Sequence, residues 1–263
     1  MRMDISGVRD KGGVAGAMHR FYVTKEQIND GNITIMGPDV NHIRNVLRMK
    51  PGDEIIICNG QGKDCYCIIN EVSETRVTAL VSNICDTASE LKTKITLYQG
   101  LPKLDKMELI IQKAVELGVN EIVPVITKRT VVKLEDKRKE EKKLERWQAI
   151  SEGAAKQSGR GVIPVVRPVQ TYKESVIEAS RSGLGLIPYE NAADISETRR
   201  IIKSLNQYEA VSVFIGPEGG FEEAEIELAK EYKLQPITLG RRILRTETAG
   251  LAVLSMMMLE LEE

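Results

Sequence analysis

Residues 91–263 alternate between short apolar runs and helical patterns, and no other feature of the sequence constrains the fold as strongly. Such alternation predicts a mainly parallel β-sheet with helices on both faces. Ligands bind to sheets of this kind beyond the carboxyl ends of the strands, so a functional site is expected in the loops that follow them. Five runs have the length of strands: 94–100, 121–127, 184–190, 211–216 and 236–240.

Helical patterns lie between these runs and after the last one. The stretch 103–118 ends at Gly118, a typical C-cap residue. The final stretch, which begins near Thr246, is almost free of charge and therefore predicts a core helix. Its apolar run is too short to span a bilayer. The other helices are expected at about 137–157, 171–182, 194–204 and 222–233.

Residues 18–90 follow a different pattern, in which short apolar runs are separated by tight turns. Turn residues at 51–53, 59–62 and 73–75 divide these runs, and one helical stretch begins at Pro38. Strands at such close spacing predict a small β-barrel.

The first 17 residues are small, polar and rich in glycine, and they lack the apolar segment of a secretory signal. We expect a leader or a disordered tail there. The predicted organisation is therefore a tail over 1–17, a small barrel over 18–90 and an α/β domain over 91–263.

Composition excludes several classes of protein. With 42% hydrophobic residues and a net charge of −1, the chain can bury a core but has no overall attraction to nucleic acid, so RNA contacts must be local. There are four cysteines without CxxC spacing and two histidines, which argues against a zinc site. Cys65 and Cys67 share one face of a strand, as expected of buried thiols in a reducing cytoplasm.

Two loops after predicted strands are rich in glycine and polar residues. The first, GPEGG at 216–220, allows close approach of a ligand to the backbone, but it is neither a P-loop nor a GxGxxG motif. The second runs from Leu239 to Ala249 and leads into the last helix, with Thr246 or Thr248 as a natural N-cap. Together they predict a glycine-lined, partly apolar site with a polar rim, although a tight turn and a helix-start ion pair would explain either loop alone.

This pair of motifs, IGPEGGF followed by LGRRILRTETA, resembles the SPOUT methyltransferases. More narrowly, it is similar to the RsmE family of 16S rRNA (uracil-N3) methyltransferases. Three further stretches carry the resemblance: MHRFYV at 18–23, HIRNVLRMKPGDEI at 42–55 and EGAAKQSGRGVIPVV at 152–166. The similarity covers about 18–263.

The resemblance implies properties that the sequence pattern alone does not. It implies a trefoil-knotted α/β domain, a PUA-like RNA-binding barrel, a homodimer and bound S-adenosylmethionine. The residues that it assigns to the cofactor are Gly216, Glu218, Gly219, Gly220, Leu239, Gly240, Ile243, Leu244, Thr248 and Ala249.

Transfer of an activated methyl group to uracil N3 needs no metal, but the acceptor must be aligned and must lose a proton. Arg245 is the candidate to stabilise the uracil anion or to bind RNA phosphate. Glu247 is the candidate to orient Arg245 or to take the proton, and a structural ion pair at the helix start is the alternative. RNA contacts are expected at Arg20, His42, Arg44, Arg48, Lys156, Gln157, Ser158 and Arg160.

Three alternatives remain open from the sequence. The first is a SPOUT enzyme that methylates a ribose 2′-OH or acts on another RNA. The second is a non-catalytic RNA-binding or ribosome-assembly protein with the same fold. The third, a nucleotide-binding protein, is disfavoured because the lysine of a phosphate loop is missing. The expected substrate is 16S rRNA, in the assembled small subunit.

Overall fold

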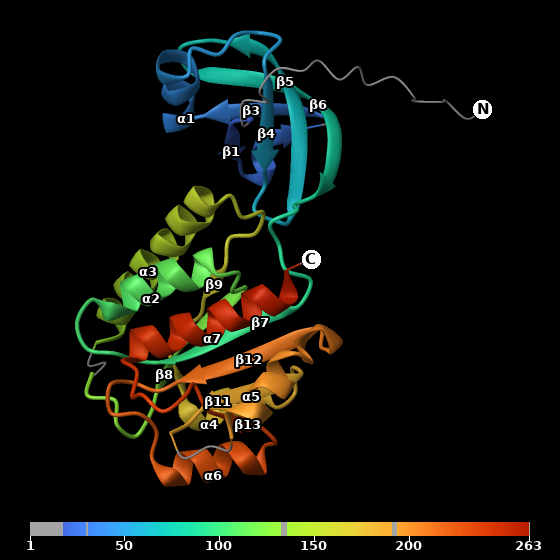
Figure 1. Ribbon diagram of the computed structural model, residues 1–263. Helices are drawn as coiled ribbons and strands as arrows, with labels where there is room; N and C mark the ends of the chain where they lie inside the picture. Colours follow the sequence, from blue (N-terminus) through green and yellow to red (C-terminus); the bar gives the residue numbers. More distant parts are fainter. Residues whose placement is uncertain (1–17, 30, 133–135, 191–193, 263) are drawn as a thin grey trace. The chain divides into compact units, whose positions relative to one another are not determined.

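The computed structural model describes residues 18–29, 31–132, 136–190 and 194–262 (Figure 1). The tail predicted for residues 1–17 lies outside them. The chain forms two compact units. The first comprises the described residues up to Cys58 together with Asp64–Cys85, and the second comprises the turn Asn59–Lys63 and the chain from Asp86 onward. The expected division at residue 90 lies a few residues inside the second unit.

The first unit is a six-stranded sheet, in agreement with the β-rich prediction. The two edge strands pair with different neighbours: β1 runs parallel to β4, and β2 runs antiparallel to β3. Alternate residues of the strands face a core that includes Ile33, Ile35, Ile55 and Ile57. In sheet order the strands are β1 (Arg20–Tyr22), β4 (Glu54–Cys58), β5 (Lys63–Val72), β6 (Arg76–Asp86), β3 (Asn32–Met36) and β2 (Ile28–Asn29).

Helical structure in this unit is short. A 3₁₀ turn spans Lys25–Gln27. Helix α1 (Pro38–Asn41) continues directly into one π-helical segment, His42–Val46, so the helical stretch predicted from Pro38 onward is confirmed with a local change of pitch. Cys65 and Cys67 are buried on the same face of β5, as their spacing predicts.

The second unit is built on a seven-stranded sheet in which every recorded pairing is parallel. The five predicted strands are all present. Two short strands, β9 (Val165–Val166) and β10 (Gln170–Thr171), have only two residues each, too few to leave a periodic pattern in the sequence. The long strands are β7 (Lys94–Gly100), β8 (Glu121–Ile126), β11 (Leu184–Pro188), β12 (Ala210–Ile215) and β13 (Gln235–Ile237).

Helices cover both faces of this sheet, as the βα alternation predicts (Figure 1). Apolar residues of α2, α3, α5 and α7 pack on one face, and those of α4 and α6 pack on the other. The ring of Tyr98 stacks on that of Phe214, its register partner in β12, at 4.5 Å between centroids. The helices are α2 (Lys106–Glu116), α3 (Lys137–Ser158), α4 (Tyr172–Ala179), α5 (Ile195–Ile202), α6 (Glu223–Glu231) and α7 (Thr246–Leu261), with a 3₁₀ turn at Leu205–Gln207.

Within the described part of the chain, the helices are too short or too polar to cross a membrane. The same residues contain no group of three or more His, Cys, Asp or Glu side chains arranged to hold a metal ion.

Candidate active site

Loops from four parallel strands meet at the carboxyl edge of the second unit's sheet. They follow β7, β8, β12 and β13, and the loop after β13 leads into α7 (Figure 1). This is the edge at which ligands bind to such sheets. Both glycine-rich motifs singled out in the sequence lie here.

The loops after β7 and β12 touch each other through their backbones. A Cβ on Gly100 would lie 2.6 Å from Pro217 Cδ and 2.7 Å from its backbone nitrogen. Gly216 is confined within its own loop, because a Cβ there would lie 3.0 Å from the backbone of Gly220. Gly100 is therefore required for the close approach of the two loops, and Gly216 for the tight turn of the GPEGG loop.

The Glu218 carboxylate ties the GPEGG loop to the start of α2. Its oxygens accept hydrogen bonds from the backbone N–H of Lys103 at 3.1 and 3.3 Å, and Lys106 Nζ lies 3.2 Å from Oε1. Partial burial alone would raise the pKa of this carboxyl. The hydrogen bonds from its own amide and that of Lys103, and the Lys106 ammonium, outweigh burial and lower the pKa.

The loop after β8 supports the other side of the GPEGG loop. Arg129 donates a hydrogen bond of 2.7 Å to the carbonyl oxygen of Gly219, and a Cβ on Gly219 would lie 3.1 Å from Arg129 Cβ. The backbone N–H of Lys128 donates to Glu225 Oε1 on α6. Arg129 therefore contributes to the shape of the loop.

A buried polar network joins β7, the GPEGG loop and the start of α7. Gln99 donates to Thr246 Oγ1 at 2.9 Å, and the Thr246 hydroxyl donates to the carbonyl oxygen of Gly216 at 2.6 Å. The prediction that Thr246 or Thr248 is the N-cap is wrong. Arg245 occupies that position, because the Thr246 hydroxyl is engaged with the preceding loop.

Glu247 and Arg245, the predicted catalytic residues, lie at the first turn of α7 and just before it. Arg245 is exposed. Among the described residues, the cation beside Glu247 is Lys106, with its Nζ 3.5 Å from Glu247 Oε2, and not Arg245. Oε2 is buried without a hydrogen-bond partner in the described structure. A local Arg245–Glu247 pair, the structural interpretation of these residues, is therefore replaced by a pair with α2.

The predicted cofactor residues surround this arrangement. Gly220 and Gly240 have positive φ angles of 67° and 105°, and a Cβ on either would meet no atom within 4 Å. Ile243 is 91% exposed, whereas Leu239, Leu244 and Ala249 are partly buried. Thr248 is exposed on α7.

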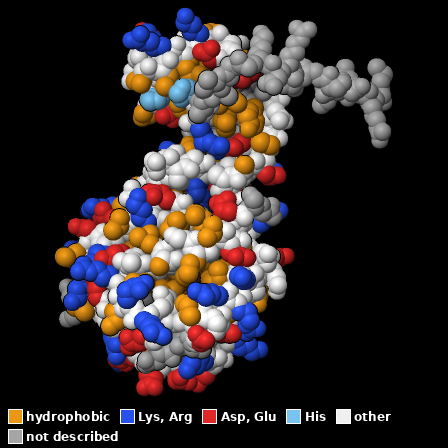
Figure 2. Space-filling model, viewed as in Figure 1, with side chains coloured by type: hydrophobic (Ala, Val, Ile, Leu, Met, Phe, Trp, Pro, Cys, Tyr) orange, Lys and Arg blue, Asp and Glu red, His pale blue; other side chains and the backbone are white. Residues whose placement is uncertain are grey.

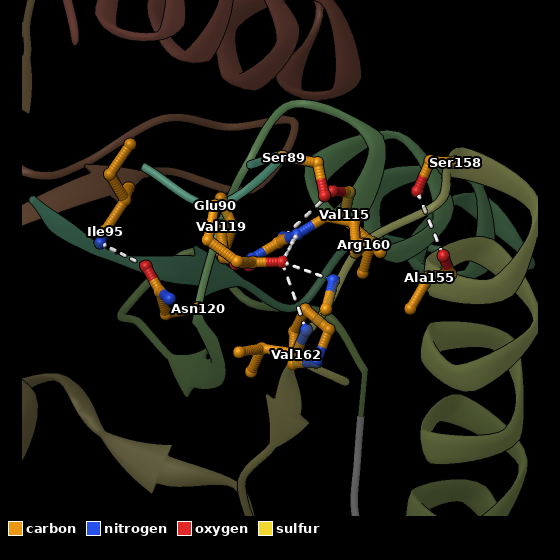
Figure 3. A network of polar contacts seen from close by, with 12 residues as sticks. Ser89, Glu90, Ile95, Val115, Val119, Asn120, Ala155, Ser158, Arg160 and Val162 are labelled. Atoms are coloured by element: carbon orange, nitrogen blue, oxygen red, sulfur yellow. Dashed lines mark hydrogen bonds and ion pairs between the residues drawn. The ribbon is translucent and has the colours of Figure 1, made fainter. Parts of the chain in front are cut away.

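The structure overturns one predicted RNA contact. Arg160 is 2% exposed, and its guanidinium donates to both oxygens of Glu90 and to the carbonyls of Val115 and Val119 (Figure 3). The Glu90 carboxylate also accepts from the backbone N–H groups of Gly161 and Val162. Arg160 therefore belongs to the interior of the second unit and is removed from the RNA-binding set.

The remaining predicted RNA residues differ in their exposure and in their partners. Lys156 and Gln157 are exposed near the end of α3, Lys156 pairs with Glu152 at 2.7 Å, and Ser158 donates to the carbonyl of Ala154. In the first unit His42, Arg44 and Arg48 are exposed, and Arg44 pairs with Glu74 at 3.2 Å. Arg20 is engaged by Asp64 through two bonds of 2.6 and 2.7 Å, so little of its guanidinium is available.

Sequence reasoning missed two residues of this site, Gln99 and Lys106. Gln99 is a fully buried amide in a strand whose other buried side chains are Ile95, Leu97 and Tyr98, and a polar residue at the end of such a strand is a signal. Lys106 is a cation at the first position of a helix, where acidic residues are favoured. Gln99 is polar where a buried strand favours apolar residues, and Lys106 is basic where a helix start favours acidic residues.

Two family matches divide the chain in the same way as the structure. Residues 89–258 match the RNA methyltransferase domain, and residues 35–82 match the RNA methyltransferase PUA domain. The first match alone covers more than half of the chain.

Individual relatives match over almost their whole length. The ribosomal RNA small subunit methyltransferase E of Bacillus subtilis (strain 168) is 40% identical over 244 residues, which are 90% of this chain and 95% of the relative. That of Mesomycoplasma hyopneumoniae (strain 232) is 35% identical over 238 residues, 90% and 98% of the two chains.

A solved structure also matches. The crystal structure of a ribosomal RNA small subunit methyltransferase E from Neisseria gonorrhoeae, bound to S-adenosyl methionine, has a TM-score of 0.74 and 36% identity, and the match covers 90% of this chain and 95% of that one. The fold, the domain matches and these relatives agree, and the chain belongs to the family of ribosomal RNA small subunit methyltransferase E.

Proposed function

We propose that this protein transfers a methyl group from S-adenosylmethionine to N3 of a uridine in the 16S rRNA of the small ribosomal subunit. The observation that carries the proposal is the contact between the two glycine motifs, in which the Thr246 hydroxyl binds the Gly216 carbonyl at the carboxyl edge of the sheet. The relatives' names supply small-subunit rRNA as the substrate. Uridine and its N3 atom come from the motif resemblance.

The residues at this edge fit the cofactor. Open space beside the backbone at Gly220 and Gly240 leaves room for a ligand against the main chain. Ile243 is almost fully exposed, so its apolar side chain can pack against a flat base. The residues that would hold the cofactor are Gly216, Glu218, Gly219, Gly220, Leu239, Gly240, Ile243, Leu244, Thr248 and Ala249.

S-adenosylmethionine, when bound, supplies a methyl group activated by a sulfonium, so that the new N3–carbon bond forms as the sulfur–carbon bond breaks. This chain must remove the N3 proton of uracil and stabilise the negative charge that results. Glu247 is assigned as the proton acceptor, because its carboxylate lies at the start of α7, where the Lys106 ammonium 3.5 Å from Oε2 holds it in place. The exposed Arg245 guanidinium is assigned to the uracil oxygens or to an adjacent phosphate.

RNA contacts are assigned to exposed basic and polar side chains of each unit. In the second unit these are Lys156 and Gln157, with the partly buried Ser158 next to them. Arg129 is less suited, since its guanidinium binds Gly219. In the first unit, the PUA domain, they are His42, Arg44 and Arg48, with Arg20 in a supporting role because it is held by Asp64. Surface contacts of this kind bind the RNA backbone and weaken with salt.

The active form is proposed to be a homodimer. Figure 2 shows hydrophobic side chains gathered on the face of the second unit where α7 lies in Figure 1. Leu259 of α7 is 78% exposed and Leu109 of α2 is 44% exposed. Residues 248–259 contain no charge, although one side of the helix faces away from the core. An apolar helix face of this kind is typical of a subunit interface.

The proposed test uses small ribosomal subunits that lack the modification, incubated with the protein and labelled S-adenosylmethionine. The rRNA is then digested, and the labelled nucleoside is identified by mass spectrometry. 3-Methyluridine is the expected product, whereas a 2′-O-methylated nucleoside would replace the proposed acceptor. Free 16S rRNA serves as the parallel substrate. A higher rate of methyl transfer to the subunit than to the free rRNA would support action after assembly. Absence of both transfer and cofactor binding would favour a non-catalytic RNA-binding protein.

A further inference from the structure

We propose that Lys106 is a positioning residue, which fixes Glu247 against the cofactor loop and so sets the proton acceptor for methyl transfer. The proposal rests on the function proposed above and adds a residue that neither motif contains. Lys106 is the first residue of α2, six residues beyond the carboxyl end of β7 and outside both glycine motifs.

The Lys106 ammonium lies between two carboxylates from distant parts of the sequence. Its Nζ is 3.2 Å from Glu218 Oε1 in the GPEGG loop and 3.5 Å from Glu247 Oε2 in α7. The exposed fractions of the three side chains are 30%, 29% and 17%, so water screens these charges only in part. Without the ammonium, two carboxylates would face each other across the site.

The position of Lys106 in α2 supports a role outside the helix. The positive end of the helix dipole is at the N-terminus, where a lysine is unfavourable and an acidic residue is preferred. Here the two carboxylates offset that cost. The hydrogen bond with Glu218 raises the pKa of Lys106, and the Glu247 carboxylate adds to this effect.

The same contacts explain how Lys106 positions Glu247. Glu218 is held by the backbone N–H of Lys103, so the ammonium has a fixed anchor on one side. On the other side it forms an ion pair with Glu247 Oε2 at 3.5 Å, and this oxygen is buried. Lys106 therefore holds the Glu247 carboxylate in a fixed position beside the GPEGG loop.

The first test compares Lys106→Met, Lys106→Arg and the control Lys113→Met. Lys113 lies on the same helix and pairs with Glu116 at 2.8 Å, so its substitution removes an equivalent charge away from the site. Lys106→Met should lower the single-turnover rate of methyl transfer at least tenfold, while the cofactor Kd from calorimetry changes less than threefold. Lys106→Arg should recover part of the rate, and Lys113→Met should match the wild type. A rate loss equal to that of Lys113→Met would overturn the proposal.

A double substitution separates positioning from general damage. If Lys106 acts through Glu247, then Lys106→Met in a Glu247→Gln background should cause less than a twofold further loss of rate. A tenfold loss in that background would show that Lys106 acts independently, against the proposal.

Hydrogen exchange gives a readout that needs no methyl transfer. Lys106→Met should speed amide exchange in 216–220 and in 245–249 together, whereas Lys113→Met should change neither. If the wild-type protein transfers no methyl group, the proposed function fails, and this measurement still decides the placement of Lys106. Faster exchange in one segment alone, or in neither, would refute the bridge.

Discussion

Arg160 and Glu90 form an ion pair that is almost closed to solvent, and they satisfy one another's hydrogen bonds together with four backbone groups. The sequence predicts an RNA contact at Arg160, because the cluster at the end of the long helix matches a motif of the family that the chain resembles. The structure assigns it to the interior since Glu90, 70 residues earlier, supplies a complementary carboxylate. A sequence motif cannot reveal such a distant partner.

Replacement of Arg160 by Met should lower the free energy of unfolding by about 3–5 kcal/mol, because the Glu90 charge would stay buried and unpaired. Urea denaturation followed by the fluorescence of Trp147, which is the only tryptophan and lies in α3 of the same unit, measures this change. Arg200→Met is the control, since it removes an exposed pair with Glu197 and should leave the midpoint close to wild type. Equal midpoints for the two variants would contradict the assignment.

The cysteines provide a prediction about pH. Burial raises the pKa of the Cys67 thiol to about 12, from an ordinary value of about 9. Because the thiolate is the reactive species, iodoacetamide at pH 8.5 should spare Cys67 in the folded protein and modify the half-buried Cys85. In the unfolded chain the Cys67 thiol ionises at a lower pH than in the folded protein. The free energy of unfolding therefore falls as pH rises from about 9 to about 12. Mass spectrometry of the alkylated protein would disprove the assignment if Cys67 reacted as fast as Cys85.

Among the elements, long periodic segments were predictable and short ones were not. The helix predicted at about 137–157 spans Lys137–Ser158, and the strand predicted at 94–100 spans Lys94–Gly100. Their periodicity extends over enough residues to be distinguished from chance. The strands β9 and β10 were missed because pairing with β8, and not local sequence, makes them strands.

The candidate site follows the same rule. Strand-end loops could be recognised from glycine content, so the GPEGG loop was found from sequence. Lys106 was not, because its role depends on the meeting of β7, β12 and α7, which are far apart in the sequence. Three-dimensional neighbours of this kind are specified by the sheet order and not by any local pattern.

The glycine at the end of β7 allows a test of the contact between elements. Gly100→Ala places a Cβ against the Pro217 backbone, so the loops after β7 and β12 must separate. We expect at least a tenfold weaker cofactor Kd in calorimetry. Gly153→Ala is the matched control, since Gly153 lies within α3 with nothing within 4 Å of a Cβ. It should bind normally and gain about 0.5–1 kcal/mol of stability from better helix propensity. Normal binding by Gly100→Ala would argue against a shared site.

At the scale of the whole molecule, the exposed apolar face of α7 predicts self-association. Leu259→Lys should convert the proposed dimer to a monomer, because it places a charge on the exposed apolar side of α7. Analytical ultracentrifugation measures the mass directly. Val165→Lys is the control. Val165 lies on β9 and is 50% exposed, and this substitution should leave the mass unchanged. A wild-type protein that sediments as a monomer at micromolar concentration would rule out the proposed interface.

The order of strands in the second unit has a consequence for synthesis of the protein. β7 is made early, yet its neighbour β12 begins at residue 210, and the hydroxyl that Gln99 binds belongs to Thr246 in the last helix. A growing chain therefore carries β7 with one edge unpaired until nearly all of the sequence has been translated. The proposed methyl-transfer site therefore cannot be completed before Thr246 has left the ribosomal exit tunnel.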